Sequence, residues 1–495
     1  MRYKGVYSCV PLSACCAPIG EWLLKETFLL SVSNSWTYKS NVKHLSHVLV
    51  LLYFHSANLF AYESMITVLE GAFYIGDNDG LTDESPKHTL YVSTFKMDKT
   101  EVTISRWNQI RDWAISNGYS FSESQSYPIK GPSWYSSSDP LDYPMNNVNW
   151  YDCLKWCNAR SEFMGRRPVY YTNSSLSEVF RSGQFHIHSS YLDTQASGYR
   201  LPTEAEWEKS ARGGVTNLTH DYPWGYGISG DLANYKLSGD PFDDSTTPVG
   251  YFNGFQQISL STNSNGGENR SPENTQNKLG FYDTIGNVSE WCWDWYDSAW
   301  YSNPLASKKD TLGPSFTEEE TNINYSLDTS ESLLVDKSNW MKKVHRGGGY
   351  KTDPYDEGDP LRIAYRGVEF PTSNLRTIGL RSVREEKNDP LWFDKISLPF
   401  SQWYNLDWYG YFYESNFTWV FHEYYGWIYP TGNGSYDNWI YFHYKKQWLW
   451  TSKFAYPWHY DPAESRWLKD LSSNGEHGWF EVHADATKEK WGDGI

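Results

Sequence analysis

The chain has 495 residues, a formal net charge of −17 and a sequence pI near 5.2, and its length allows two or more domains with large buried cores. The acidic balance argues against a nucleic-acid-binding protein, because no basic stripe is available to neutralise phosphates. Six cysteines are too few for a disulfide scaffold of this size, whereas 26 tryptophans suit a heavily packed β core or a surface that stacks on sugar rings.

The first part of the chain, 1–62, is interpreted as a leader. Lys43 and His44 precede a short apolar run over 45–60. A positive end followed by such a run is typical of a secretory signal, here at about 43–61, and a buried helix of an N-terminal extension is the alternative. The run is too short and too interrupted for a transmembrane helix. We therefore expect an exported protein, periplasmic, surface-bound or secreted, with no membrane span in its mature form.

Strand and helix patterns alternate after the leader. Residues 65–76 alternate in hydropathy as strands do, whereas 101–116 and 150–163 carry apolar residues at the three-to-four spacing of amphipathic helices. Asn117 and the glycine after it are expected to end the first of these helices. The segment 168–196 is predicted to form an inserted strand pair.

A third helix is predicted within 199–214, which reads YRLPTEAEWEKSARGG. Thr203 is placed to cap this helix, and Glu206 three residues later completes a capping box. Because that structural role is sufficient, no catalytic role is assigned to Glu204, Glu206 or Glu208.

Two carboxylates flank a tight turn in the segment 279–295. Asp283 and Glu290 lie on either side of Gly286 and Asn287, which accept the positive φ that a sharp turn requires. Three tryptophans follow at alternate positions, which is the period-two pattern of a strand with one buried face. Such a turn directs main-chain carbonyls and carboxylates toward one point, the oxygen donors that a hard cation such as Ca²⁺ prefers.

Several segments together resemble the formylglycine-generating enzyme family, also called the sulfatase-modifying-factor domain, over about residues 65–386. The motifs that carry the resemblance occur in the family's order, and they are FKMDKTEVT at 95–103, VNWYD at 148–152 with Cys157 and Asn158, YRLPTEAEWEKSARGG at 199–214, GNVSEW at 286–291, HRGGGY at 345–350 and IGLR at 378–381. The resemblance implies an α+β, irregular C-type-lectin-like fold with little regular secondary structure.

The resemblance also implies two structural calcium sites. The ligands it implies are the side chains of Asn234, Asp240, Asp283 and Glu290 and the main-chain carbonyls of Tyr235, Phe242, Gly286 and Val288. Few charges mixed with neutral oxygens are expected of a structural Ca²⁺ site in a calcium-rich compartment. Asp243 and Asp244 compete with Asp240 within one loop, and a turn with solvated carboxylates is the alternative to a metal site.

The family's oxidases carry a pair of cysteines that bind copper, and this chain lacks it. Thr352 stands at the position of the first cysteine, and no cysteine follows Cys292. Cu(I) requires soft thiolate ligands, so we expect no copper, no formylglycine synthesis by that mechanism, and no catalytic or cofactor-binding residue of that kind. Cys157 is expected to be a small buried side chain, because Ser382 replaces the cysteine that often pairs with it in the family.

Aromatic residues dominate the segment 391–495, which holds 12 of the tryptophans. Short aromatic units bounded by turn-forming residues recur at irregular spacing. They predict a small all-β module of aromatic repeats. A tryptophan-packed structural domain and a ligand-binding domain are both compatible with this composition.

Two functions are compatible with these features. The first is an exported, non-oxidase family member that acts as a binding or scaffolding unit with structural calcium, and whose partner is a glycan, a cell-envelope polymer or a peptide. The second is an oxidoreductase of the same superfamily that modifies a peptide or small molecule without the cysteine pair. A plain family oxidase is disfavoured by Thr352, and an iron enzyme by the lack of an H-x₃-H or comparable helical histidine cluster before residue 65.

Overall fold

The computed structural model describes residues 64–122, 142–214, 220–242, 244–256, 273–315, 342–387, 392, 395–398, 402–415, 419–433 and 437–492. The expected signal segment at 43–61 lies outside these residues. Within the described ranges, no helix has the length and apolar character that crossing a membrane requires.

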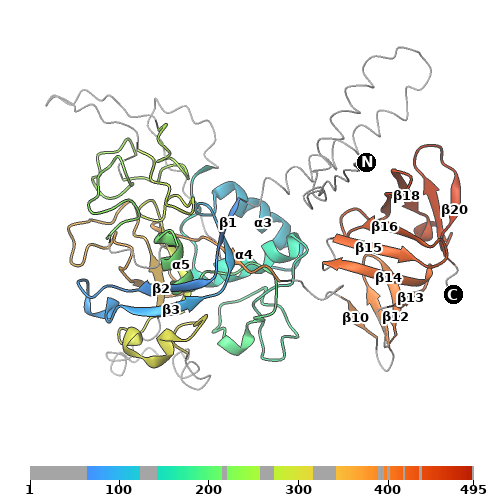
Figure 1. Cartoon of the computed structure of the whole chain (residues 1–495), viewed down its shortest axis with the longest axis horizontal. Coiled ribbons are helices and arrows are strands. Elements are labelled where there is room, and N and C mark those ends of the chain that lie inside the picture. The colour runs from blue at the N-terminus through green and yellow to red at the C-terminus, as the bar shows by residue number, and fades with distance from the viewer. Residues whose placement is uncertain are drawn as a thin grey trace, which may run out of the picture. The chain divides into compact units, whose positions relative to one another are not determined.

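The described chain up to 387 combines a few helices with many short strands (Figure 1). Its α-helices are α3 (Ile104–Ser116), α4 (Trp150–Phe163) and α5 (Glu204–Ala211). Its strands are β1 (Met65–Val68), β2 (Gly71–Ile75), β3 (His88–Val92), β4 (Phe95–Asp98), β5 (Ser289–Trp295), β6 (Lys343–Arg346), β7 (Gly367–Glu369), β8 (Ile378–Gly379) and β9 (Val383–Arg384). Long irregular connections join them, as the α+β prediction with little regular structure requires.

These strands form three small sheets. The orders are β1-β4-β9, β2-β3 and β7-β6-β5-β8, and β5 is antiparallel to β6 and parallel to β8. All seven residues of β5 are buried, so the expectation of a single buried face is wrong. The reason is that helices cover both faces: Trp150 of α4 donates to the Cys292 carbonyl at 2.8 Å, and Trp207 of α5 donates to Glu290 at 2.8 Å.

The helices largely follow the local sequence signals. α4 has the predicted bounds, and α3 begins at Ile104 because Thr103 caps it. The capping box of α5 is present. The strand pair predicted over 168–196 is wrong, since that segment forms only isolated bridges. A few main-chain hydrogen bonds remain within the segment, such as Tyr171 N to Tyr191 O at 3.0 Å. Other backbone groups bind the buried amide of Asn158, which accepts from Tyr170 N at 3.0 Å and donates to the Tyr170 carbonyl at 2.8 Å.

Removing the α5 cap should have a modest effect on stability. We expect Thr203→Ala to lower the free energy of unfolding by about 1 kcal/mol, because the Glu206 N–H loses its 3.2 Å acceptor. Urea denaturation measures the change. Thr203→Ser keeps the hydroxyl and serves as the control, and equal losses for the two variants would contradict a capping role.

The C-terminal module is all-β, as predicted. An antiparallel meander of eleven described strands runs in sequence order: β10 (Ile396–Ser397), β11 (Trp403–Leu406), β12 (Gly410–Glu414), β13 (Val420–His422), β14 (Gly426–Asn433), β15 (Asp437–Phe442), β16 (Gln447–Thr451), β17 (Trp458–Asp461), β18 (Arg466–Asp470), β19 (Trp479–Val482) and β20 (Lys488–Lys490). Its own core includes Phe412, Ile428, Ile440 and Leu449, all fully buried.

Candidate functional site

The two loops expected to bind calcium meet in the folded chain. Gly286 and Asn287 adopt φ values of +80° and +58°, and the Asn287 N–H donates to the Asn234 carbonyl at 2.9 Å. A Cβ atom on Gly286 would lie 2.3 Å from the same carbonyl oxygen, so this close approach requires glycine. The Gly286 turn is thus joined to the Asn234 loop through the main chain.

The first loop supplies one unused oxygen. Asn234 is fully buried, and its Nδ2 donates to the Ser245 carbonyl at 2.7 Å, whereas its Oδ1 has no hydrogen-bond partner among the described residues. Asp240 is also buried and accepts from Ser238 Oγ and Phe242 N, both at 2.6 Å. Asp244 instead forms an exposed ion pair with a lysine, which leaves Asp240 as the buried carboxylate of the loop. Asp243 lies outside the described residues.

The second predicted ligand set, which contains Asp283 and Glu290, lies around the buried guanidinium of Arg381. Glu290 is 1% exposed, and Arg381 binds it in a bidentate pair, with Nη2 at 2.7 Å from Oε1 and Nε at 3.0 Å from Oε2. The buried Asp283 carboxylate accepts the Gly250 N–H. Gly286 and Val288 are the residues of this set whose main-chain carbonyls were predicted to bind calcium. The Gly286 N–H donates to the Gly347 carbonyl at 2.9 Å, and Val288 is buried.

A third carboxylate at this place was missed in the sequence. Glu101, between β4 and α3, is 1% exposed, and within the described ranges no N–H or hydroxyl group donates to its oxygens, whereas the Asp283 carboxyl lies within hydrogen-bond reach. Burial, with the nearby Asp283 charge, raises the pKa of Glu101 well above its usual value. Burial likewise raises the pKa of Asp283 to about 6. Glu101 lies among polar and charged residues in the segment DKTEVT at 98–103, so no local signal in the sequence marks it as buried.

The segment around Thr352 is a closed polar turn. The Thr352 hydroxyl accepts the Gly349 N–H at 2.9 Å, its N–H donates to the Gly349 carbonyl at 2.8 Å, and its own carbonyl accepts from Lys236 N at 3.0 Å. The described cysteines are free and buried, and burial raises the pKa of each thiol. Thr352 therefore stabilises its own turn through hydrogen bonds to the main chain.

A sequence profile of the sulfatase-modifying factor enzyme 1-like domain matches residues 53–386. The chain belongs to this family. Three curated relatives are 26%, 30% and 28% identical to it: the chaperone protein LppX of Paenibacillus barcinonensis, the serine/threonine-protein kinase Pkn1 of Chlamydia trachomatis and the formylglycine-generating enzyme of Streptomyces coelicolor. The matches cover 47%, 38% and 64% of this chain, and 71%, 22% and 87% of those proteins. These three relatives have different names although they match the same domain. A functional conclusion must therefore be drawn from the residues of the site and not from the fold.

Within this sulfatase-modifying-factor domain, a polar cluster replaces the cysteine pairing common in the family. Ser382 Oγ donates to Asp98 at 2.7 Å, and Arg160 donates to the same hydroxyl at 2.6 Å and to Asp98 at 2.7 Å. Burial opposes ionisation of Asp98, but Arg160 and Arg106 outweigh it and lower the pKa of the carboxyl. The cluster therefore connects α4, through Arg160, to Ser382 near the C-terminal end of the family domain by hydrogen bonds.

The acidic residues of α5 have structural partners as well. Glu204 accepts from Arg346 at 2.7 Å and from Arg366 at 2.8 Å, and Glu208 forms ion pairs with Arg346 and Arg212. All of these side chains are buried. The network holds α5 against β6, which agrees with assigning the helix a structural role.

The two predicted ligand sets supply some, but not all, of the oxygen ligands that a calcium ion requires. No three or more Asp, Glu, His or Cys side chains converge to hold a metal within the described ranges. Each predicted set has only two acidic or amide side chains and depends on carbonyls for the rest. The Asn234 oxygen that accepts no hydrogen bond and the adjacent carboxyls of Glu101 and Asp283 suit a hard cation, whereas Glu290 is already bound by Arg381. When bound, calcium would offset the buried negative charge there, and its presence stays a prediction.

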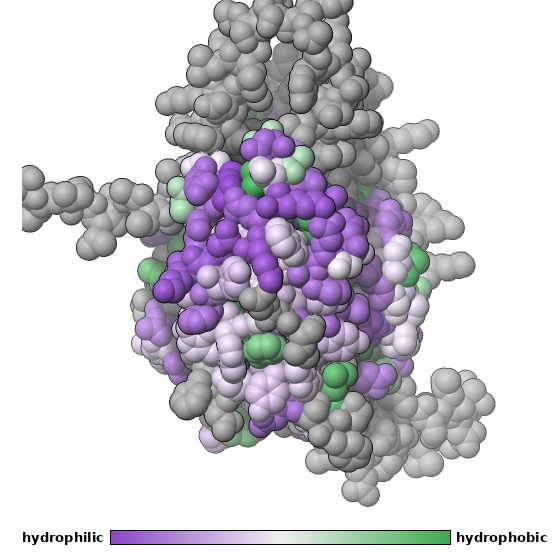
Figure 2. Space-filling view, turned by 90° about the vertical axis from the view of Figure 1, so that its right-hand side faces the viewer, coloured by the Kyte–Doolittle hydropathy of each residue, from purple (hydrophilic) through white to green (hydrophobic). Residues whose placement is uncertain are grey.

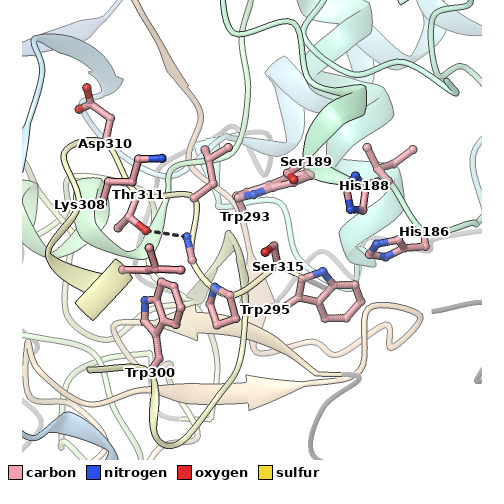
Figure 3. Close-up of a pocket in the computed structure, with 15 residues that line it drawn as sticks. His186, His188, Ser189, Trp293, Trp295, Trp300, Lys308, Asp310, Thr311 and Ser315 are labelled. Carbon is pink, nitrogen blue, oxygen red and sulfur yellow. Dashed lines mark hydrogen bonds between the residues drawn. The ribbon is translucent and has the colours of Figure 1, made fainter. Parts of the chain in front are cut away.

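An aromatic cavity that the sequence did not indicate lies beyond the other end of β5. It encloses about 240 Å³ and is lined by Trp293, Trp295, Trp300 and His186 among others (Figure 3). His186 stacks on Trp295 with ring centroids 5.2 Å apart, and burial together with the Lys343 charge lowers its pKa to about 3. An uncharged imidazole beside indole rings suits a small neutral group.

Proposed function

We propose that this chain is a non-oxidase member of the sulfatase-modifying-factor family, which acts as an exported binding or scaffolding protein stabilised by calcium. The observation that supports this most strongly is Thr352, whose hydroxyl braces its own turn where the family's oxidases place a copper-binding cysteine. A neutral hydroxyl cannot replace a thiolate for Cu(I). Export rests on the signal-like pattern at about 43–61, and we also propose that the irregular core has the C-type-lectin-like topology.

The domain nevertheless keeps an extensive buried framework. Arg381 with Glu290, and Arg346 with Glu204, connect distant segments of the family domain. Buried pairs of this kind cost much to remove, so they preserve the shape of a domain whose redox ligands are gone. A binding or scaffolding role requires that the domain keep its shape, and it does not require copper-binding thiolates.

The metal content and the chemistry of the purified full chain test this proposal. We expect bound calcium, a rise in melting temperature on adding Ca²⁺ after chelation, and no stoichiometric copper after incubation with Cu(I). A cysteine-containing sulfatase peptide should keep its mass, as followed by mass spectrometry, while the Streptomyces coelicolor formylglycine-generating enzyme, used as a positive control, should convert it. Aldehyde formation by this chain would refute the proposal.

A further inference from the structure

One face of the meander sheet in the C-terminal module is built of aromatic rings. Six of them on four consecutive strands, Phe421, Trp427, Trp439, Tyr441, Trp448 and Trp450, are called the aromatic ladder below. The strand register pairs Phe421 with Trp427, Tyr441 with Trp448, and Trp439 with Trp450. Because side chains alternate between faces along a strand, these rings point away from the buried face that carries Ile428, Ile440 and Leu449. The same row continues through Tyr460 and Trp467 on the next two strands.

The ladder is exposed although its rings are large. Trp427, Trp448 and Trp439 have 44%, 38% and 36% of their surface exposed. Neighbouring rings hold each other in place: Phe421 meets Trp427, and Tyr441 meets Trp448, each with centroids 5.4 Å apart. Rings ordered in this way lose little conformational entropy when a ligand stacks on them. An outward sheet face is ordinarily polar, so a row of exposed, ordered rings indicates a binding surface.

The ladder offers a ligand no charged side chain with which to form an ion pair. Its six rings carry no charge, and neither do Tyr429 and Thr431, the outward residues that pair with Tyr441 and Trp439. Charged outward positions occur further along, where Lys469 pairs with Glu481 and Glu481 with Lys488. The space-filling view of Figure 2 shows a pale area of residues of intermediate hydropathy below a strongly hydrophilic one. The acidic net charge of the chain, −17, disfavours anionic polymers and anionic membranes.

The geometry of the ladder selects a repeating, extended ligand. Adjacent strands lie about 4.8 Å apart, so rings recur at that interval over roughly 14 Å from β13 to β16. Pyranose rings in an extended chain present flat C–H faces that stack on indole and phenol rings, and tyrosine O–H and indole N–H groups remain available for sugar hydroxyls. A peptide added by strand pairing would use the sheet edge instead of its face.

From these observations we propose that the aromatic ladder binds an uncharged, extended β-1,4-linked polysaccharide. The proposal rests on the binding role proposed above and names the partner of that role. The module then anchors the chain to the polymer, while the sulfatase-modifying-factor domain remains available for its own contacts.

Binding isotherms of the full chain on amorphous cellulose and on chitin beads test the proposal. We expect saturable binding to at least one of these polymers and none to alginate, which is anionic. Trp427→Ala and Trp448→Ala should each weaken binding about tenfold, since each removes one stacking ring, and adding Trp439→Ala should abolish it. Tyr444→Ala is the matched control, because Tyr444 is 49% exposed in the turn between β15 and β16 and lies outside the ladder. That variant should bind like the wild type.

Near-UV circular dichroism and melting temperatures confirm that each variant is folded, and Trp448→Phe, which keeps a ring, should retain most of the binding. Absence of binding to both neutral polymers, equal binding by the folded triple variant, or tighter binding to alginate or to liposomes would overturn the proposal. The copper and aldehyde assays on the same preparation are independent of the ladder. A chain that forms no aldehyde and binds no polysaccharide would thus refute the ladder proposal and leave the non-oxidase conclusion standing.

Discussion

Arg381→Met is expected to lower the free energy of unfolding by about 3–5 kcal/mol, the cost of leaving a buried charge without its partner. Arg381 is fully buried, and besides Glu290 it donates to the carbonyls of Lys99 at 2.8 Å and Tyr282 at 2.9 Å. The guanidinium charge also opposes the burial that raises the pKa of Glu101 and Asp283. The same guanidinium donates to the carbonyls of Asp98 and Asp283 as well, so its loss leaves three buried carboxyl groups and four carbonyls without this partner.

Urea denaturation monitored by circular dichroism measures this loss. Arg111→Met is the matched control, because Arg111 forms an exposed pair with Asp112, and such pairs contribute about 0–1 kcal/mol. A double variant, Arg381→Met with Glu290→Met, should lose less than the sum of the single changes, since both partners of the pair are then gone. A loss for Arg381→Met as small as that of the control would show that the buried pair does not hold the fold.

Glu101→Gln is expected to stabilise the calcium-free protein at pH 7 and to reduce the stabilisation that calcium supplies. The folded pKa values of Glu101 and Asp283 are raised, so the folded state keeps protons that the unfolded state releases. Stability from these groups is fully present below their ordinary pKa near 4 and is lost as the pH rises, for Asp283 through its folded pKa of about 6. For Asp283 alone the loss is on the order of 3 kcal/mol. Calcium binds the ionised form, and therefore should oppose this loss.

The measurement compares unfolding free energies of the wild type and Glu101→Gln from pH 4.5 to 7.5, in EDTA and in excess Ca²⁺. Taking the difference cancels the opposite contribution of carboxylates such as Asp98, whose pKa is lowered in the folded state. In EDTA the wild type should fall relative to the variant as the pH rises. Glu357→Gln, an exposed change, is the control. An unchanged difference at all pH values and calcium levels would show that Glu101 faces neither a buried charge nor a metal.

Local signals in the sequence predicted the helices well. The bounds of α4 and the capping box of Thr203 and Glu206 follow from apolar spacing and capping chemistry, which act within a few residues. The strand pair at 168–196 failed for the opposite reason. Several of its backbone groups bind Asn158, a side chain on another element, and no pattern within the segment indicates that partner.

The family, the missing copper thiolates and the strands of the aromatic module all follow from residues read in order, because motifs, cysteine positions and strand-length aromatic units are properties of short segments. The charge cluster does not, since Glu101, Asp283 and Arg381 are brought together by strands and turns from both ends of the family domain. The same holds for the direction of each ring. Tyr441 and Phe442 are adjacent aromatics, yet Phe442 is buried and Tyr441 faces outward, because only pairing with neighbouring strands sets which side of the sheet meets the core.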